Sequence, residues 1–231
     1  MIQIRRSHER GRVRMGWLDS HHTFSFGSYH DPRFMGFGPL RVINEDRVDP
    51  GAGFPTHGHR DMEILSYVVE GALAHQDSTG GGGVIQPGEV QVMSAGSGVH
   101  HSEMNGSRVA PVHFLQIWLV PTSRGAAPRY AQRDFGREEG VTLLVSPEGR
   151  DGSLSIRQDA DVHRVRLGDG ASASLALRHP SAWVQVVHGS FSLAGERLEA
   201  GDGAALTEVA SLSLTARAPE DLAEALVFDL P

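Results

Sequence analysis

Residues 51–105 organise this chain: the stretch begins with GAGFPTHGHRDMEILSYVVEG and ends with PGEVQVMSAGSGVHHSEMN. It contains two short pairs of candidate metal ligands, His57 with His59 and His101 with Glu103. A β-strand points every second side chain to the same face, so each pair projects from one face of a strand. If two such strands line a small barrel, all four side chains converge on one interior point.

The side chains of these two pairs suit a divalent transition metal. Imidazole binds iron, nickel, copper and zinc, and a carboxylate completes a site whose remaining positions stay open for a substrate or O2. A turn rich in glycine or proline leads into each pair. The sequence therefore favours a metal centre over the alternative, in which the histidines cap turns or lie on the surface.

The composition excludes several classes of enzyme. The chain has 231 residues, which allows one large all-β domain or two small ones. It contains no cysteine, and all 21 basic residues are arginine. A disulfide framework, a thiolate ligand, a Schiff-base lysine and a phosphate-loop lysine are therefore excluded. The chemistry that remains available comes from His, Asp, Glu and a bound metal.

Charge and hydropathy bear on the partners and location of the protein. The formal net charge is −7 with histidine neutral, which makes binding to nucleic acid unfavourable. The locally basic start, IRRSHERGRVR at residues 4–14, is expected to be a solvated edge strand. The sequence has no apolar run of about 18 residues and no apolar leader segment. We therefore expect a cytoplasmic protein that does not contact a membrane.

Short apolar segments between glycine- and proline-rich turns predict an all-β chain rather than alternating strands and helices. STGGGG is expected to be a flexible hairpin tip. Helix is expected only in short pieces, with Pro128–Phe135 and Pro219–Ala225 as the best candidates. The expected strands lie at residues 1–14, FSFGSY (24–29), 40–48, 62–70, 72–78, 84–93, 112–121 and 226–230.

The second half of the chain repeats the plan of the first. SYVVEGALAHQ (66–76) corresponds to VQVVHGSFSLA (184–194), and VIQPGEVQVM (84–93) corresponds to RLEAGDGAAL (197–206). We therefore expect two domains, at residues 1–121 and 133–231, joined by a linker at residues 122–132. The second copy lacks both ligand pairs, so we expect it to bind no metal.

Three segments of the sequence resemble the pirin family of bicupin proteins. They are WLDSHHTFSFGSYHDPRFMGFGPLRVINED (17–46), FPTHGHRDMEILSYVVEGALAHQDS (54–78) and PGEVQVMSAGSGVHHSE (87–103). The resemblance covers roughly residues 5–120 and extends more weakly over the second half. The general cupin motifs fit with two departures: Gly71 comes one place late, and Gly96 stands where a proline is usual.

The resemblance implies a bicupin fold, with two tandem cupin β-barrels of the double-stranded β-helix, or jelly-roll, type and few short helices. It implies that the metal ligands are His57, His59, His101 and Glu103. We expect one divalent transition metal per chain, with Fe(II) favoured and Zn, Ni, Cu, Mn or Co as alternatives. Some pirins act as quercetinases, so the implied activity is metal-dependent opening of a flavonol ring, such as that of quercetin, by O2 with loss of carbon monoxide.

Glu63 is an alternative fourth ligand, because ordinary cupins use that position and it shares strand parity with His57 and His59. We favour Glu103, which pairs with His101, and we expect Glu63 to orient a ligand imidazole. The remaining histidines are not expected to be metal ligands. We expect His100 at a turn or rim, His75 and His113 in the core, and His21, His22 and His30 in capping or surface positions.

The predicted reaction gives Glu103 a catalytic role, since a carboxylate that shifts between metal and proton is suited to act as the base. Phe24, Phe26 and Met93 are expected either to line an apolar pocket or to pack in the core. The expected partners are a small aromatic substrate and O2, with the chain acting as a monomer. The alternatives are a metal- or redox-responsive regulator that binds another protein without turnover, and another cupin reaction, such as an isomerisation, that needs no O2.

Overall fold

The computed structural model describes residues 1–218 and 221–231, and nearly all of its regular structure is β-strand, which confirms the all-β prediction. The helices of the described residues are two short 3₁₀ turns, η1 (Ser7–Glu9) and η2 (Arg150–Gly152). The chain divides into two compact units. The N-terminal unit comprises Gly11–Arg137 and Leu154–Gln158, and the C-terminal unit comprises Met1–Arg10, Glu138–Ser153 and Asp159–Pro231.

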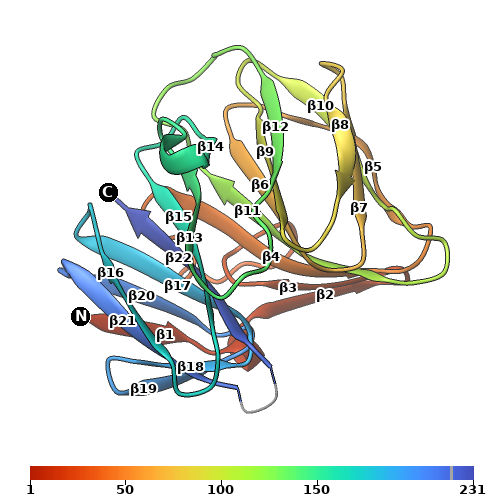
Figure 1. Cartoon of the computed structure of the whole chain (residues 1–231). Helices are drawn as coiled ribbons and strands as arrows, with labels where there is room; N and C mark the ends of the chain where they lie inside the picture. Colours follow the sequence, from red (N-terminus) through yellow and green to blue (C-terminus); the bar gives the residue numbers. More distant parts are fainter. Residues whose placement is uncertain (219–220) are drawn as a thin grey trace. The chain divides into compact units, whose positions relative to one another are not determined.

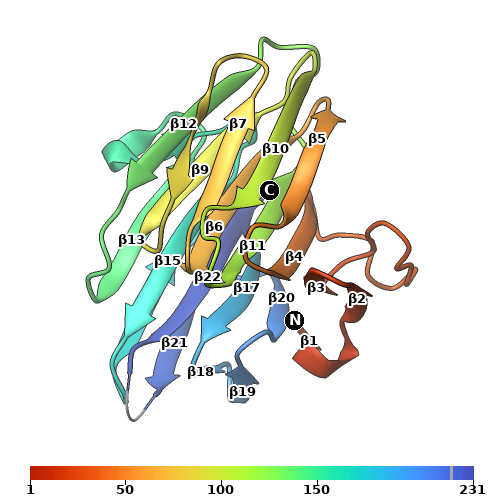
Figure 2. The ribbon, with the colours of Figure 1, turned by 90° about the vertical axis from the view of Figure 1, so that its right-hand side faces the viewer.

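The N-terminal unit is built from two antiparallel sheets that face each other (Figure 1). The larger sheet has the strand order β12-β9-β6-β11-β4-β3-β2, and the smaller has the order β5-β10-β7-β8. In Figure 2, β7, β10 and β5 of the smaller sheet lie side by side. The strands of this unit are β2 (Gly11–Met15), β3 (Leu18–His22), β4 (Leu40–Val48), β5 (Gly53–His59), β6 (Glu63–Glu70), β7 (Leu73–Asp77), β8 (Gly82–Ile85), β9 (Glu89–Ser94), β10 (Val99–Asn105), β11 (Val112–Leu119), β12 (Arg129–Asp134) and β14 (Leu154–Ser155).

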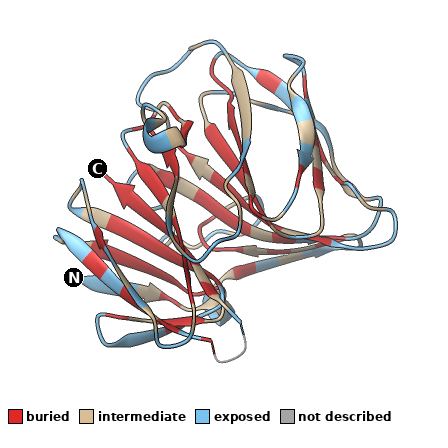
Figure 3. Ribbon diagram, viewed as in Figure 1, coloured by how far each residue is buried: buried red, intermediate tan, exposed pale blue. Residues whose placement is uncertain are grey.

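Strand parity decides which side chains of this unit turn inward. On β10 the odd-numbered residues from Val99 to Asn105 are buried, and the residues between them are exposed or half-buried. The inner face of β10 therefore carries polar groups, including His101 and Glu103. Apolar clusters pack beside them, one around Phe114 and another around Ile64. His101 and Glu103 are thus polar side chains beside apolar clusters in the interior of this unit. Figure 3 shows the buried segments of its strands in red.

The C-terminal unit has the same kind of construction. Its strands in one sheet follow the order β1-β20-β17-β22-β15-β13, and those in the other follow the order β16-β21-β18-β19. Its interior holds a large apolar cluster that includes Leu175 of β16 and Leu212 and Leu214 of β21. The strands of this unit are β1 (Ile2–Arg5), β13 (Gly140–Ser146), β15 (Asp161–Leu167), β16 (Ser172–Ala176), β17 (Ser181–His188), β18 (Ser190–Leu193), β19 (Glu196–Glu199), β20 (Gly203–Thr207), β21 (Ser211–Arg217) and β22 (Ala223–Leu230).

The pairing of strands confirms the internal repeat. In the first copy β6 pairs with β9 and β7 pairs with β8, and in the second copy β17 pairs with β20 and β18 pairs with β19. By this correspondence the β5–β10 pair, which carries the histidines, matches the β16–β21 pair, which carries leucines. The absence of a metal from the second barrel stays a prediction, and it is supported by this apolar replacement.

The predicted helix at Pro128–Phe135 is wrong, because these residues form β12. β12 lies at the edge of the larger sheet, where it pairs with β9 from Arg129 opposite Ser94 to Asp134 opposite Glu89. The backbone groups of this segment find partners on a neighbouring strand, so tertiary pairing outweighs the local signal of a proline at a helix start.

Three smaller predictions also need correction. FSFGSY is a turn closed by a single bridge between Phe26 and Tyr29, because Gly27 takes a left-handed φ of 56°. Residues 1–14 form β1, η1 and the start of β2 rather than one strand. The predicted helix at Pro219–Ala225 is wrong for Ala223–Ala225, which begin β22, while residues 219–220 lie outside the described residues.

The two compact units differ in outline from the predicted domains. Met1–Arg10 belong to the C-terminal unit, and the segment 122–132, expected to be a linker, contains the start of β12. The boundaries 1–121 and 133–231 remain a prediction about domains that fold independently. Among the residues that the structure describes, no helix is long and apolar enough to cross a membrane. The cytoplasmic location also stays a prediction.

Candidate metal centre

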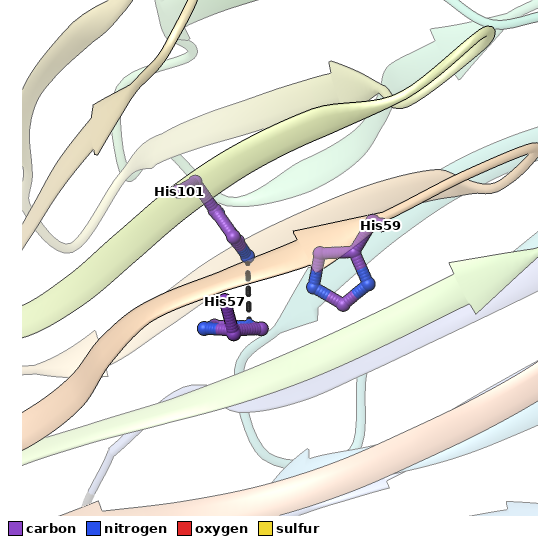
Figure 4. A group of neighbouring side chains, drawn as sticks. All are labelled: His57, His59 and His101. Atoms are coloured by element: carbon purple, nitrogen blue, oxygen red, sulfur yellow. Dashed lines mark hydrogen bonds between the residues drawn. The ribbon is translucent and has the colours of Figure 1, made fainter.

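The three histidines of the site come from two strands that pair with each other. β5 and β10 are antiparallel, and their register places His101 directly opposite His57 and Val99 opposite His59. His57 and His59 are two residues apart on β5, so their side chains share one face. The strand geometry expected from the sequence thus brings His57, His59 and His101 together, as Figure 4 shows.

The distances between the imidazoles match those of ligands to one ion. One ring nitrogen from each of the three side chains lies within 4.8 Å of the others. The Nε2 atoms of His57 and His101 are 3.1 Å apart (Figure 4). Two nitrogens bound about 2.1 Å from one ion, at roughly right angles, are separated by about 3.0 Å. The His57–His101 pair is therefore spaced for shared coordination of a divalent metal.

The hydrogen bonds of the rings leave their Nε2 atoms available. His57 Nδ1 lies 2.9 Å from the carbonyl oxygen of Pro55, which fixes the proton on Nδ1 and leaves the lone pair on Nε2. His59 Nε2 is buried and has no hydrogen-bond partner among the described residues. A buried polar atom without a partner is uncommon and needs an explanation, which a bound metal supplies for His59.

Burial keeps two of these imidazoles neutral. It lowers the pKa of His59 to about 4, with the neighbouring His57 adding to the shift. It lowers the pKa of His101 to about 2, with His57, His59 and His75 adding to the shift. A metal binds the neutral form of imidazole, so the site is in the state needed for binding at neutral pH.

Glu103 lies on the same inner face of β10 but is held apart from the three histidines. Its Oε1 accepts a hydrogen bond of 2.9 Å from Ser66 Oγ, and its Oε2 accepts one of 2.8 Å from Gln116 Nε2. The pKa of Glu103 is raised to about 7, mainly by burial and also by the charge of Asp46, while the two hydrogen bonds oppose the shift. Among the described residues, the group of ligand atoms within 4.8 Å of one another contains no Glu103 oxygen.

Glu63 points away from the site. The expectation that it shares a face with His57 and His59 and orients a ligand imidazole is therefore wrong. The left-handed Asp61 (φ 50°) turns the chain between β5 and β6, so Glu63 begins a strand of the other sheet. On β6, Glu63 and Ser66 face opposite sides, and Ser66 is the residue that contacts Glu103. The Glu63 carboxylate accepts a 2.6 Å hydrogen bond from Ser94 instead of orienting a ligand imidazole.

His75 lies in the core, as the sequence predicted, but its contact with His101 was not predicted. His75 is buried on β7, and its Nε2 lies 3.0 Å from Nδ1 of His101. Finding this contact requires the register of β7 against β10, which no local pattern reveals. The other histidines lie outside the cluster. His100 and His30 are exposed, as expected, and His21 is half-buried. His22 is buried against Phe26, so its expected capping or surface position is wrong, and His113 is half-buried and bonded to Glu45 rather than fully in the core.

An aromatic wall stands beside the cluster. The ring of Trp118 packs edge-on against His59 with centroids 4.9 Å apart, and Phe26 packs edge-on against Trp118 at 5.2 Å. Of the predicted pocket residues, Phe26 belongs to this wall, while Phe24 is fully buried and Met93 packs in an apolar cluster with Ile64. The sequence does not single out Trp118, because its strand, VHFLQIWLVP, is apolar over its whole length and predicts only core packing.

Comparison with known proteins agrees with this geometry. Residues 3–119 match the family model "Pirin", and residues 143–230 match "Quercetinase C-terminal cupin domain". The chain is 46% identical over 232 residues to the quercetin 2,3-dioxygenase of Escherichia coli (strain K12), an alignment that covers 100% of this chain and 99% of that one.

Solved structures show the same fold. The bacterial pirin YhhW from Escherichia coli, in complex with nickel(II), has a TM-score of 0.95 and 44% identity, covering 100% of this chain and 99% of that one. A quercetin 2,3-dioxygenase from Acinetobacter baumannii shares the fold alone, with a TM-score of 0.76 and 22% identity over 96% of this chain and 85% of that one. The bicupin fold is therefore established, a metal-binding site is supported by the histidine cluster and by the nickel-bound relative, and the chain belongs to the pirin family.

Proposed function

We propose that this protein is a metal-dependent dioxygenase that opens the ring of a flavonol such as quercetin with O2. The observation that carries the proposal is the convergence of three inward-facing imidazoles, His57, His59 and His101, with two Nε2 atoms spaced for one ion. The names of relatives that are 46% identical over the whole chain support it.

The proposed ligands are His57, His59, His101 and Glu103, with one metal per chain. The three histidines fit by geometry, and Glu103 fits by its place two residues from His101 on the same buried face. Fe(II) is the favoured metal, because an imidazole-rich site with one carboxylate and open positions is typical of non-haem iron oxygenases. Affinity alone favours copper and nickel, so the metal found after purification is a poor guide to the native one.

A metal held by these residues would act as a Lewis acid, which would lower the pKa of the flavonol 3-hydroxyl and orient the substrate. Glu103 would accept the proton of that hydroxyl, since burial raises the pKa of its carboxyl group well above the usual range. Ser66 and Gln116 hold the carboxylate in place through their hydrogen bonds. Trp118 and Phe26 offer an apolar wall for a planar aromatic ring.

The test is to remove the metal with a chelator, to reconstitute the protein with each of Fe(II), Zn, Ni, Cu, Mn and Co, and to follow the visible absorption of quercetin. The proposal expects loss of absorption in air and none under nitrogen. A loss that is equal in air and nitrogen would indicate a cupin reaction without O2, and no loss with any metal would favour a regulator that binds another protein.

A further inference from the structure

His75 occupies the inner face of the smaller sheet next to a proposed metal ligand. β7 pairs with β10, and the register sets His75 opposite Glu103 and Asp77 opposite His101. His75, Asp77 and Leu73 are the buried residues of β7, so the imidazole of His75 points into the barrel. There its Nε2 lies 3.0 Å from Nδ1 of His101, with ring centroids 5.1 Å apart.

This contact determines which protons the two rings carry. If His101 uses the lone pair of Nε2 to bind a metal, its proton is on Nδ1. That N–H then donates to His75 Nε2, and the proton of His75 has to lie on Nδ1. Among the described residues no donor points at the buried Nδ1 of His75, so nothing in the structure requires that nitrogen to keep a lone pair.

A second layer of residues holds His75 in this orientation. The ring of Tyr130, from β12, stacks on His75 with centroids 4.9 Å apart and an interplanar angle of 15°. Tyr130 is fixed in turn, because its hydroxyl donates to Gln132 Oε1 over 2.8 Å. Gly81 makes room for it, since a Cβ added there would lie 2.7 Å from Tyr130 Cβ. The absence of a side chain at Gly81 therefore leaves the space that Tyr130 occupies.

We propose that His75 is a positioning residue of the metal centre, which accepts a hydrogen bond from Nδ1–H of His101 and so aims Nε2 of His101 at the metal. The inference rests on His101 being a metal ligand, as proposed above. His57 is oriented by the backbone carbonyl of Pro55. His101 is oriented by a side chain, so only this second interaction can be removed by substitution.

Two substitutions separate the hydrogen bond from packing. His75→Phe keeps a ring for Tyr130 to stack on but removes the acceptor, whereas His75→Gln removes the ring but keeps an acceptor oxygen. We expect His75→Phe to bind Co(II) about 10–100-fold more weakly in chelator competition and to shift its visible d–d bands. His75→Gln should remain close to the unsubstituted protein, and so should the control His113→Ala, because His113 is bonded to Glu45 outside the histidine cluster.

Nitrogen chemical shifts of the histidine rings in the Zn-loaded protein provide a measurement that needs no variant. The inference expects both His101 and His75 to carry their protons on Nδ1. A proton on Nε2 of His75, or unchanged Co(II) affinity and spectrum in a folded His75→Phe variant, would overturn it. His101→Ala distinguishes the two proposals: if that variant still binds one Co(II) tightly, the ligand assignment fails, and if it loses Co(II) while His75→Phe does not, only the role of His75 fails.

Discussion

The Nε2 atoms of His57 and His101 lie 3.1 Å apart because the two residues face each other directly across the β5–β10 pair. Immediately after His101 the register shifts, so that Glu103 lies opposite Phe54. The bulge separates the carboxylate from the histidines while leaving both on the inner face of β10. The core of the site is thus set by backbone pairing rather than by mobile loops.

Removal of one imidazole should abolish metal binding without unfolding the chain. The apolar clusters around Phe114 and Ile64 do not depend on the metal, unlike the interior of a zinc finger. We expect His57→Ala and His101→Ala to lose stoichiometric metal by elemental analysis and to keep the circular dichroism spectrum of the unsubstituted protein. The exposed His188→Ala serves as the control and should keep its metal. A variant that unfolds would show that the metal is structural.

The two candidate carboxylates should respond differently to replacement by an amide. Glu103→Gln should weaken metal binding strongly, because a negative charge beside the ion is lost. Glu63→Gln should leave metal affinity unchanged and should lower the free energy of unfolding by about 1–3 kcal/mol, since the buried bond from Ser94 is weakened. Titration of both variants with the same metal and urea unfolding measure the two effects. Weaker metal binding by Glu63→Gln would require a different ligand set.

The contribution of Asp46 to the stability of the metal-free protein should fall as the pH rises. Burial raises the pKa of Asp46 from 3.8 to about 7, and Glu45 adds to the shift while the hydrogen bond from Ser20 opposes it. Between these values the unfolded chain has lost the proton and the folded chain retains it, so stability is full below about pH 4 and is lost through about pH 7. The shift corresponds to a decrease on the order of 4 kcal/mol.

Replacement of Asp46 tests this pH dependence. Glu103, whose pKa is also raised to about 7, adds a second decrease over the same pH range. Above about pH 6.5, where the histidines are neutral in the folded and the unfolded chain, the Asp46→Asn variant should lose stability with a shallower slope, and it should be more stable than the unsubstituted protein at pH 8. Urea unfolding of the metal-free proteins at several pH values measures the slope. Equal slopes for both proteins would show that Asp46 is ionised when folded.

The hairpin around Gly81 should not accept a side chain. A Cβ at Gly81 would lie 2.5 Å from Asp77 Oδ2 and 2.7 Å from Tyr130 Cβ, so the strand or the ring has to move. We expect Gly81→Ala to destabilise the protein by about 1–3 kcal/mol. Thermal unfolding compares it with Gly168→Ala, where the new Cβ would meet only the flexible Glu139 side chain at 3.4 Å. Equal melting temperatures would contradict the close packing around Tyr130.

The sequence alone predicts the parts of the site that depend on short-range geometry. The two-residue spacing places His57 beside His59 and places Glu103 on the same inward face as His101, as β10 shows. The same rule fails for Glu63, since Asp61 turns the chain into another sheet before Glu63 is reached. The alternation of side chains predicts a shared face only within one continuous strand. The spacing of the residues does not show that β5 ends before Glu63.

Contacts between distant strands could not be predicted. The bond between His75 and His101 depends on the register of β7 against β10, and the stack of Tyr130 on His75 depends on β12 being a strand. The segment of Tyr130 has a proline and small residues that favour a short helix, and only pairing with β9 makes it extended. The internal repeat, in contrast, could be recognised from the sequence, because each copy keeps its glycine turns.

The most direct test of the proposed reaction is a gas balance with quercetin and the metal-loaded protein. Ring opening by a dioxygenase should consume O2 and release carbon monoxide in equal amounts, and neither should occur with His101→Ala, which lacks one of the three clustered imidazoles. Quercetin loss without carbon monoxide, or equal gas exchange by the His101→Ala variant, would contradict the assignment of a flavonol dioxygenase at this metal centre.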